Sequence, residues 1–369
     1  MPDGEVIVCL GRLQIAMILD WLKKGVVLGD GGALFELERR GYVSAGPFTP
    51  EVSIEHPEAL RQVQIDFARA GAQVLQALTY YAHEEKLRQI GKQSAMAEIN
   101  SAAVQIASEV AHAYGCLVAG NLANTWAYDP KDSGTSEKTR RQYDQQIEYQ
   151  LSGGIDFFIA ETLEYLGEAK IALDSIKASG KSAMITLGFK YADRTLDGVI
   201  LEEAFRELED EGADIVGLNC FRDPPRMLPL ARRVRNTVSC FVATQPVAYR
   251  CSEKKPYFQI QGYLGRPAFP LELDPFVLTR FEMADYALKA KEGGINYIGG
   301  CCGTAPHHLR AMAEALGRTV PNSKYSPRLD LHPIIGSEEH IKERDERILR
   351  EQRQDMGIAH FQSLEMRKK

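Results

Sequence analysis

The sequence lacks the features that mark nucleic-acid-binding, secreted or membrane-spanning proteins. It has no surplus of positive charge, because 50 acidic residues outnumber 44 lysines and arginines and give a net charge of −6. It has no dense, even set of cysteines, because its seven cysteines are spread over 369 residues. These absences argue against a polyanion partner and a disulfide scaffold, and they favour small-molecule chemistry in a reducing cytoplasm.

A long uninterrupted apolar run is also missing from the N-terminus. Residues 1–25 open with acidic residues and are interrupted by Arg12 and Asp20, so neither a signal peptide nor a membrane span is expected. We predict a helix over 1–25 that leads into an α/β barrel over 26–318. A C-terminal extension over 319–369 follows, with a charged helix that is either a solvated appendage or an oligomerisation arm.

Short apolar runs recur along the chain, and each is followed by a charged stretch with helical periodicity. This alternation is typical of parallel βα units, and eight such units close a (β/α)₈ TIM barrel. The eight runs are 26–32, 74–80, 117–123, 157–162, 182–187, 215–220, 240–246 and 297–302. The segment 249–272, rich in Pro, Gly and aromatic residues, is predicted to be a long loop that belongs to the site.

Three cysteines follow the sixth and eighth of these runs, at the barrel end where catalytic groups gather. Cys220 ends the sixth run, and Cys301 and Cys302 end the eighth, flanked by Gly300 and Gly303. Glycines on both sides let the backbone turn so that both sulfurs can face one point. A buried cysteine that only packs is the alternative, and we assign that role to Cys9, Cys116, Cys240 and Cys251.

Three thiolates suit Zn²⁺ and leave a fourth position open, as in catalytic zinc sites. Such an electron-rich centre is a poor Lewis acid for water, but it can hold a substrate thiol as thiolate at neutral pH. The sequence therefore predicts alkyl transfer to sulfur.

Other polar groups end strands on the same rim. Asp30 and Glu161 could hold a substrate ammonium, while the amides of Gly31 and Gly32 at a helix start could take its carboxylate. Together these groups could bind an amino acid, although a capping or surface role remains open for either acid.

Three aromatic residues are candidates for a cage around a quaternary cation, which aromatic faces attract. They are Phe48, Tyr80 and Tyr81. Packing in the core is the alternative role for each of them.

With these residues assigned, the chain resembles the homocysteine S-methyltransferase family, and within it the betaine-using branch. The resemblance extends from about Val26 to Arg318. It is carried by GDGG at 29–32, RGYVSAGPFTPE at 40–51, EHPEALRQ at 55–62, the segment 76–81, GLNC at 217–220, QPVAY at 245–249 and IGGCCG at 298–303.

The resemblance implies zinc on the three cysteines, homocysteine sulfur as the fourth ligand, a betaine-type methyl donor and a homodimer or homotetramer. It places the homocysteine site at Asp30, Gly31, Gly32, Glu161 and Asn219, and the methyl-donor pocket at Phe48, Gln76, Tyr80 and Tyr81. No separate general base is assigned. Three positions depart from the betaine-using pattern: Phe48 replaces Trp, Tyr80 replaces Phe and Thr162 replaces Tyr.

Two alternatives stay open. The first keeps homocysteine as acceptor but uses another donor, such as S-methylmethionine, another sulfonium or betaine, or a methyl-corrinoid protein. The second is a barrel whose zinc is structural or whose thiols sense redox state, without methyl transfer.

Overall fold

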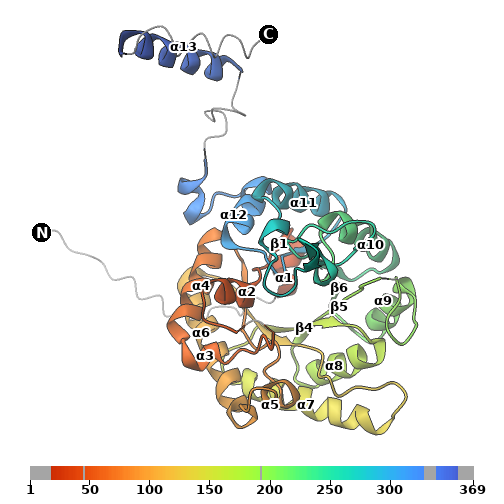
Figure 1. The fold of residues 1–369 in the computed structure, drawn as a ribbon. Helices are drawn as coiled ribbons and strands as arrows, with labels where there is room; N and C mark the ends of the chain where they lie inside the picture. Colours follow the sequence, from red (N-terminus) through yellow and green to blue (C-terminus); the bar gives the residue numbers. More distant parts are fainter. Residues whose placement is uncertain (1–17, 45, 192, 328–337, 356–369) are drawn as a thin grey trace, which may run out of the picture. The chain divides into compact units, whose positions relative to one another are not determined.

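Eight parallel strands form the centre of the protein. The computed structural model describes residues 18–44, 46–191, 193–327 and 338–355. The strands are β1 (Val27–Leu28), β2 (Val74–Gln76), β3 (Leu117–Leu122), β4 (Phe157–Leu163), β5 (Ser182–Leu187), β6 (Ile215–Asn219), β7 (Phe241–Gln245) and β10 (Tyr297–Ile298). They pair in the order β1-β10-β7-β6-β5-β4-β3-β2. Each coincides with a predicted run, and the predicted (β/α)₈ barrel is confirmed (Figure 1).

Helices surround the strands on the outside of the barrel (Figure 1). They are α2 (Ala33–Arg39), α3 (Val52–Glu55), α4 (Pro57–Ala70), α5 (Glu84–Arg88), α6 (Met96–Tyr114), α7 (Gly134–Leu151), α8 (Leu166–Ala178), α9 (Leu201–Asp210), α10 (Pro224–Thr237), α11 (Arg280–Glu292) and α12 (Pro306–Ala315). Their buried faces follow the sequence periodicity: α9, for example, buries Leu201, Ala204, Phe205 and Leu208. This spacing of three and four residues puts all four side chains on one face.

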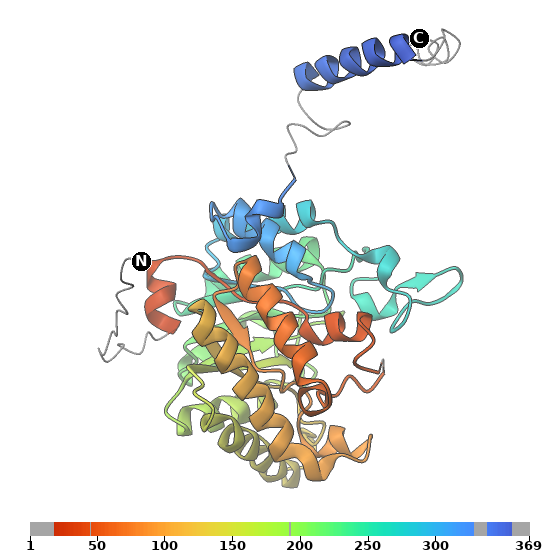
Figure 2. The same ribbon diagram turned by 90° about the vertical axis from the view of Figure 1, so that its left-hand side faces the viewer.

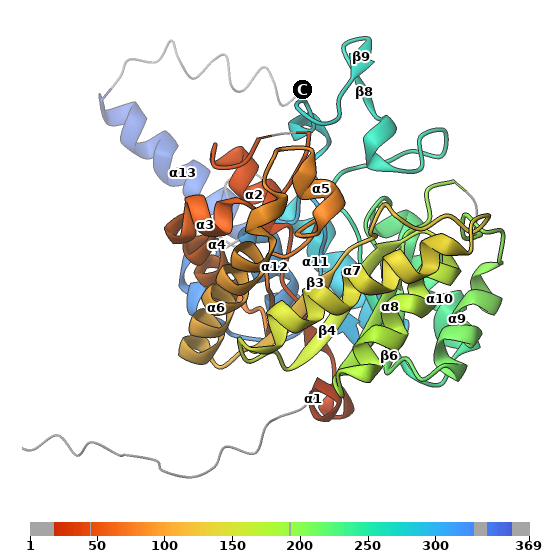
Figure 3. The same ribbon diagram turned by 90° about the horizontal axis from the view of Figure 1, so that it is seen from below.

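The barrel interior is apolar at the amino ends of the strands, and a helix closes this end. Ile18 and Leu22 of α1 (Ile18–Lys24) join a buried cluster with Val27, Phe157 and other side chains from the strands. Figure 3 shows α1 on the side opposite the β8–β9 hairpin. The predicted N-terminal helix is therefore present over 18–24, while residues 1–17, including Cys9, lie outside the described residues.

The interior is polar at the carboxyl ends of the strands. Side chains alternate along each strand, and this alternation explains which residues point inward there. In β3, Leu117 and Ala119 belong to the interior cluster, so Asn121 continues the same face at the carboxyl end. Polar side chains at this end include Gln76 in β2, Asn121 in β3, Glu161 in β4 and Asn219 in β6. Alternation thus delivers polar groups from separate strands to one end of the barrel.

The seam between β1 and β2 is closed partly by side chains. The amide of Gln73 donates to the carbonyl oxygen of Leu28 (2.8 Å), and the Gln73 side-chain oxygen accepts from the Leu28 amide (3.0 Å). Further along, Asp30 Oδ2 accepts from the amide of Gln76 (2.8 Å). Asp30 therefore supports the barrel as well as facing its open end.

The predicted long loop after β7 carries short elements of its own. They are η2 (Phe258–Ile260), β8 (Gly262–Tyr263), β9 (Arg266–Pro267) and η3 (Asp274–Phe276), and β8 and β9 form an antiparallel hairpin. Figure 2 shows this turquoise hairpin projecting from the barrel. Phe258 and Phe269 of this loop line the central cavity, so the loop belongs to the site as predicted.

The chain divides into two compact units, residues 1–321 and 322–369. The predicted charged helix is present as α13 (Glu338–Asp355), and a short turn, η4 (Pro321–Tyr325), lies at the division. The role of α13 as a solvated appendage or an oligomerisation arm remains a prediction. None of the helices in the described ranges is long and apolar enough to cross a membrane.

Candidate active site and metal centre

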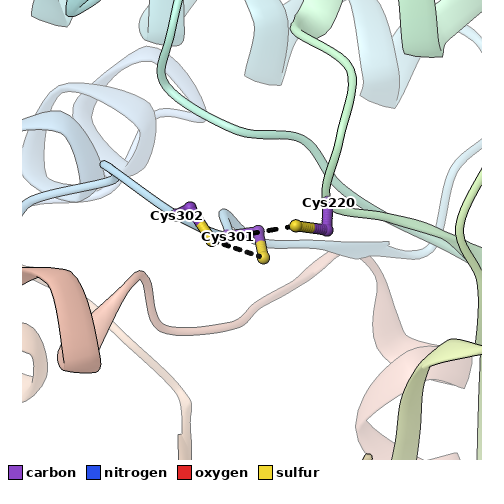
Figure 4. A group of neighbouring side chains, drawn as sticks. All are labelled: Cys220, Cys301 and Cys302. Carbon is purple, nitrogen blue, oxygen red and sulfur yellow. Dashed lines mark hydrogen bonds between the residues drawn. The ribbon is translucent and has the colours of Figure 1, made fainter. Parts of the chain in front are cut away.

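Three cysteine side chains converge at the carboxyl end of the barrel. The Cys302 sulfur lies 3.7 Å from that of Cys220 and 3.8 Å from that of Cys301. All three sulfurs lie within 4.8 Å of one another and point toward a common position (Figure 4). The convergence predicted from the strand ends is therefore present.

The spacing of these sulfurs fits a tetrahedral metal ion. With Zn–S bonds of about 2.3 Å, two sulfurs of a tetrahedron lie roughly 3.8 Å apart. The two short separations in the cluster match that value. Thiolate sulfur suits soft ions such as Zn²⁺, so the cluster could supply three of the four ligands of such an ion.

The thiols also influence one another's ionisation. Hydrogen bonds from Cys301 and Cys302 lower the pKa of Cys220 to about 5. The same contacts with Cys220 raise the pKa of Cys301 and Cys302 well above the ordinary value. Because like charges repel, all three can ionise together only when a cation shares their charge.

Close backbone packing explains the glycines around the pair. A Cβ on Gly32 would lie 2.8 Å from the carbonyl oxygen of Cys301, so the loop after β1 can approach the cysteines only without a side chain. Gly303 has a φ of 81°, which favours glycine. The backbone therefore turns immediately after Cys302.

A chain of amide groups links the two predicted acids. Gln76 Nε2 donates to Asp30 Oδ1 (3.2 Å), and Gln76 Oε1 accepts from Asn121 Nδ2 (2.7 Å). Asn121 Nδ2 also donates to Glu161 Oε1, and Asn219 Nδ2 donates to Glu161 Oε2 (2.8 Å). Amide side chains of three strands, β2, β3 and β6, thus fix the two carboxyl groups.

Burial makes these two acids reluctant to ionise. It raises the pKa of Asp30 to about 7 and that of Glu161 to about 8, and the charge of Cys301 adds to both shifts. A positively charged group between them would favour their ionised form. The pair is therefore suited to an ammonium.

The helix start near Gly31 is partly occupied by the protein's own hydrogen bonds. The Gly32 amide donates to the Thr304 carbonyl oxygen (3.0 Å), and the Ala33 amide donates to the Gly31 carbonyl oxygen (2.9 Å). The Gly32 amide is therefore engaged, which bears against its predicted role as a direct donor. The amides of Leu34 and Phe35 follow in the first turn of α2, where amides lack intrahelical partners.

The cysteines and acids open into one cavity of about 540 Å³. Its walls include the predicted residues Asp30, Gly31, Gly32, Phe48, Gln76, Tyr80, Tyr81, Glu161, Cys220, Cys301 and Cys302. Asn219 does not line it. This residue is 1% exposed, and its side chain holds Glu161 and the amide of Thr162 (2.8 Å). Its position is that of a support behind the cavity wall.

Aromatic rings form part of the wall. Tyr80 and Tyr81 lie with ring centroids 4.3 Å apart, and Trp126 lies edge-on to Tyr81 at 6.0 Å. Lys86, which does not line the cavity, has its ammonium 4.4 Å from the Tyr81 ring centroid and 4.6 Å from that of Trp126. Phe48 also lines the cavity and stacks on Phe35 at 5.1 Å.

Backbone strain is concentrated around the cavity. Among the described residues other than glycine, positive φ angles occur at Phe48, Tyr81, Trp126, Thr162, Cys220, Phe221 and Leu264. All except Leu264 line the cavity. Such conformations cost about 1–3 kcal/mol each and persist where the surrounding structure enforces them, often at functional sites.

Several cavity residues were not predicted from the sequence. Asn121 follows the alternation of β3 and could have been found from it, since Asn121 is the one polar side chain of the apolar run LVAGNLA and shares a face with Leu117 and Ala119. Trp126, Glu164 and Lys190 lie in loops after the strands. Their sequence gives no periodic signal that marks them.

Comparison with known proteins identifies the family. The family model described as homocysteine S-methyltransferase matches residues 27–316. Betaine–homocysteine S-methyltransferase 1 from Danio rerio is 41% identical over 307 residues, covering 81% of this chain and 75% of the relative. The same enzyme from Mus musculus is 40% identical, covering 81% and 74%. S-methylmethionine–homocysteine S-methyltransferase from Pongo abelii is 35% identical, covering 85% and 87%.

A solved structure supports the fold. The metallated form of the homocysteine methyltransferase MmuM from Escherichia coli has a TM-score of 0.63 at 22% identity, covering 79% of this chain and 96% of that chain. Together with the sequence matches over most of the chain, this shows that the protein belongs to the homocysteine S-methyltransferase family.

Proposed function

We propose that the protein transfers a methyl group from glycine betaine, or a close quaternary ammonium analogue, to the sulfur of homocysteine. The products are methionine and dimethylglycine. The observation that carries this proposal is the convergence of three thiols in a cavity that also holds acids and aromatic rings. Relatives about 40% identical that are named betaine–homocysteine S-methyltransferases support the choice of donor.

Cys220, Cys301 and Cys302 would hold zinc, which supplies an open fourth position and keeps a substrate thiol ionised at neutral pH. An ordinary thiol with a pKa of about 8.5 is only a few per cent ionised at pH 7, so this effect matters for attack on carbon. Asp30 and Glu161 would receive the ammonium of homocysteine, and its charge would stabilise both carboxylates. The amides of Leu34 and Phe35 would receive its carboxylate.

The donor would occupy the aromatic part of the cavity. Phe48, Tyr80 and Tyr81 would present ring surface to its quaternary ammonium. Gln76, which donates to Asp30 Oδ1 (3.2 Å), lines the same cavity. Lys86 places a second positive charge against the Tyr81 and Trp126 rings, which moderates their attraction for a cation. This moderation is useful because the donor charge disappears during transfer, and tight binding of that charge would raise the barrier.

The transfer itself needs no general acid. The thiolate sulfur attacks a methyl carbon in line, the new S–C bond forms and the C–N bond breaks. The nitrogen keeps the bonding electron pair and leaves as a neutral tertiary amine. The protein contributes alignment of the two substrates and exclusion of water from the cavity.

A donor screen tests this function. The zinc-loaded protein is incubated with homocysteine and, separately, glycine betaine, S-methylmethionine, a sulfonium betaine or a methyl-corrinoid protein, and methionine is quantified. We expect turnover with glycine betaine. Turnover with another donor and none with glycine betaine would show that the proposed donor is wrong. The replacement of Trp, Phe and Tyr by Phe48, Tyr80 and Thr162 makes this comparison informative.

A second measurement separates an enzyme from a structural metal or redox site. Zinc X-ray absorption should change when homocysteine is added, because its sulfur would enter the fourth position. An unchanged spectrum together with no methionine formation would favour a closed site. A sizing column would test the predicted homodimer or homotetramer.

A further inference from the structure

The cavity contains an ion pair that the proposed chemistry does not use. Lys190 follows β5 and Glu164 follows β4, and both line the cavity. The Lys190 ammonium lies 2.8 Å from Glu164 Oε1 and 3.0 Å from Glu164 Oε2. It also lies 4.6 Å from the ring centroid of Phe221, which directly follows Cys220.

The backbone around Lys190 is firmly held. Arg222 Nε donates to the carbonyl oxygen of Phe189 (2.8 Å), and Arg222 Nη2 donates to that of Tyr191 (3.1 Å). These two bonds fix the residues on either side of Lys190. Its ammonium is therefore presented from a fixed origin, which reduces the entropy lost when it binds a ligand.

The charges of the cavity wall give Lys190 a distinct position. Four acids line the cavity, namely Asp30, Glu161, Glu164 and Glu168. Among the described residues of this wall, Lys190 is the single lysine or arginine. A zwitterionic donor brings a carboxylate as well as a cation, and Lys190 is the cationic side chain of this wall that could attract this carboxylate.

The ion pair leaves room for a second carboxylate. A lysine ammonium has three N–H donors, so the contact with Glu164 need not use all of them. The side chains of Lys190 and Glu164 are 32% and 15% exposed, and partly exposed ion pairs contribute little free energy. Glu164 can thus hold the ammonium in place while a ligand carboxylate binds to it.

The pair follows two residues that lie close together at the cavity wall. A Cβ on Gly188 would lie 2.5 Å from the Phe221 ring and 3.5 Å from Thr162 Cγ2, so Gly188 and Thr162 are neighbours beside Phe221, which follows Cys220. Lys190 and Glu164 each stand two residues further along their segments. We propose that Lys190 binds the carboxylate of the methyl donor and selects zwitterionic donors over quaternary ammonium alcohols. This inference rests on the proposed methyl transfer and names the donor's second anchor.

The test compares Lys190→Met and Lys190→Arg with the wild-type protein. Removing a charged hydrogen bond should raise the KM for glycine betaine about tenfold to a hundredfold in Lys190→Met, with the KM for homocysteine and the zinc content unchanged. Lys190→Arg should recover most of the loss. Lys170→Met is the matched control, since Lys170 also contacts two carboxylates, Glu207 and Glu211, outside the cavity.

Two product analogues make the test specific for the carboxylate. Dimethylglycine and dimethylethanolamine share an amine, but only the first has a carboxylate. Both compounds are tested as inhibitors that compete with the donor. The Lys190→Met substitution should weaken inhibition by dimethylglycine and leave inhibition by dimethylethanolamine unchanged. Equal effects on both inhibitors, an unchanged KM for betaine, or an equal rise in the KM for homocysteine would overturn the assignment.

The wild-type measurement keeps the two proposals separable. If the wild type does not use betaine, the proposed donor is wrong. The Lys190 assignment is then tested with S-methylmethionine, which also carries a carboxylate, in the same variants. An unchanged KM for that donor in Lys190→Met would refute the assignment independently.

Discussion

Replacing Cys302 by alanine should abolish zinc binding at ordinary concentrations. The Cys302 sulfur lies 3.7 Å and 3.8 Å from the sulfurs of Cys220 and Cys301, so it is central to the cluster. Structural zinc sites with four ligands bind with about 10–16 kcal/mol, or roughly 3 kcal/mol for each ligand. Loss of one of three protein ligands should therefore weaken zinc binding about 100-fold to 1,000-fold.

The assay is metal content after dialysis against a zinc buffer, measured by mass spectrometry. Cys251→Ala is the matched control, because Cys251 is also buried, lies outside the cluster and donates to the Tyr249 carbonyl oxygen (3.4 Å). The control should keep about one zinc per chain, and Cys302→Ala should lose zinc and methionine formation. A Cys302→Ala protein with full activity and no metal would refute the site.

Three further predictions concern the donor, the support of the acids and acid stability. Tyr81→Ala should raise the donor KM or lower kcat by about 2-fold to 30-fold through loss of a cation–π contact, and the KM for homocysteine should change little; kinetics equal to wild type would remove Tyr81 from the donor pocket. Asn219→Leu removes bonds to Glu161 and Thr162, so urea unfolding should show a loss of about 2–4 kcal/mol, and an unchanged midpoint would contradict that support. Burial lowers the pKa of His308 to about 4, below about 6.5 in the unfolded chain. Its contribution of roughly 3 kcal/mol is thus present above pH 6.5 and lost as the pH falls toward 4; His308→Gln should flatten this slope in denaturation series, and an unchanged slope would exclude His308 as the cause.

The location of the strands could be predicted from the sequence because it depends on local pattern. Apolar runs separated by amphipathic stretches specify βα units, and all eight predicted runs are strands of the barrel. The three cysteines at the metal centre followed from the rule that parallel strands end on one rim. Their neighbours Gly32 and Gly303 are explained by contacts that the sequence does not display.

The polar support of the site required the tertiary structure. Asn121 and Asn219 come from strands that do not pair with each other, yet both donate to Glu161 across the interior. Which oxygen each amide meets depends on strand tilt and register, and no local pattern encodes these. Asn219, which is predicted at the homocysteine site, holds Glu161 from behind the cavity wall, and its place in the sequence does not show this.

The sequence by itself determined the barrel and the cysteines that could share a metal. Apolar runs that alternate with amphipathic stretches are a local pattern of the chain, and parallel strands place the residues that follow them on one rim. Only the tertiary structure decided that Lys190 meets Glu164 beside Phe221, and that the Gly32 amide is already bonded to Thr304. Loop residues have no repeating pattern, so their partners are fixed only when the closed barrel brings separate loops together.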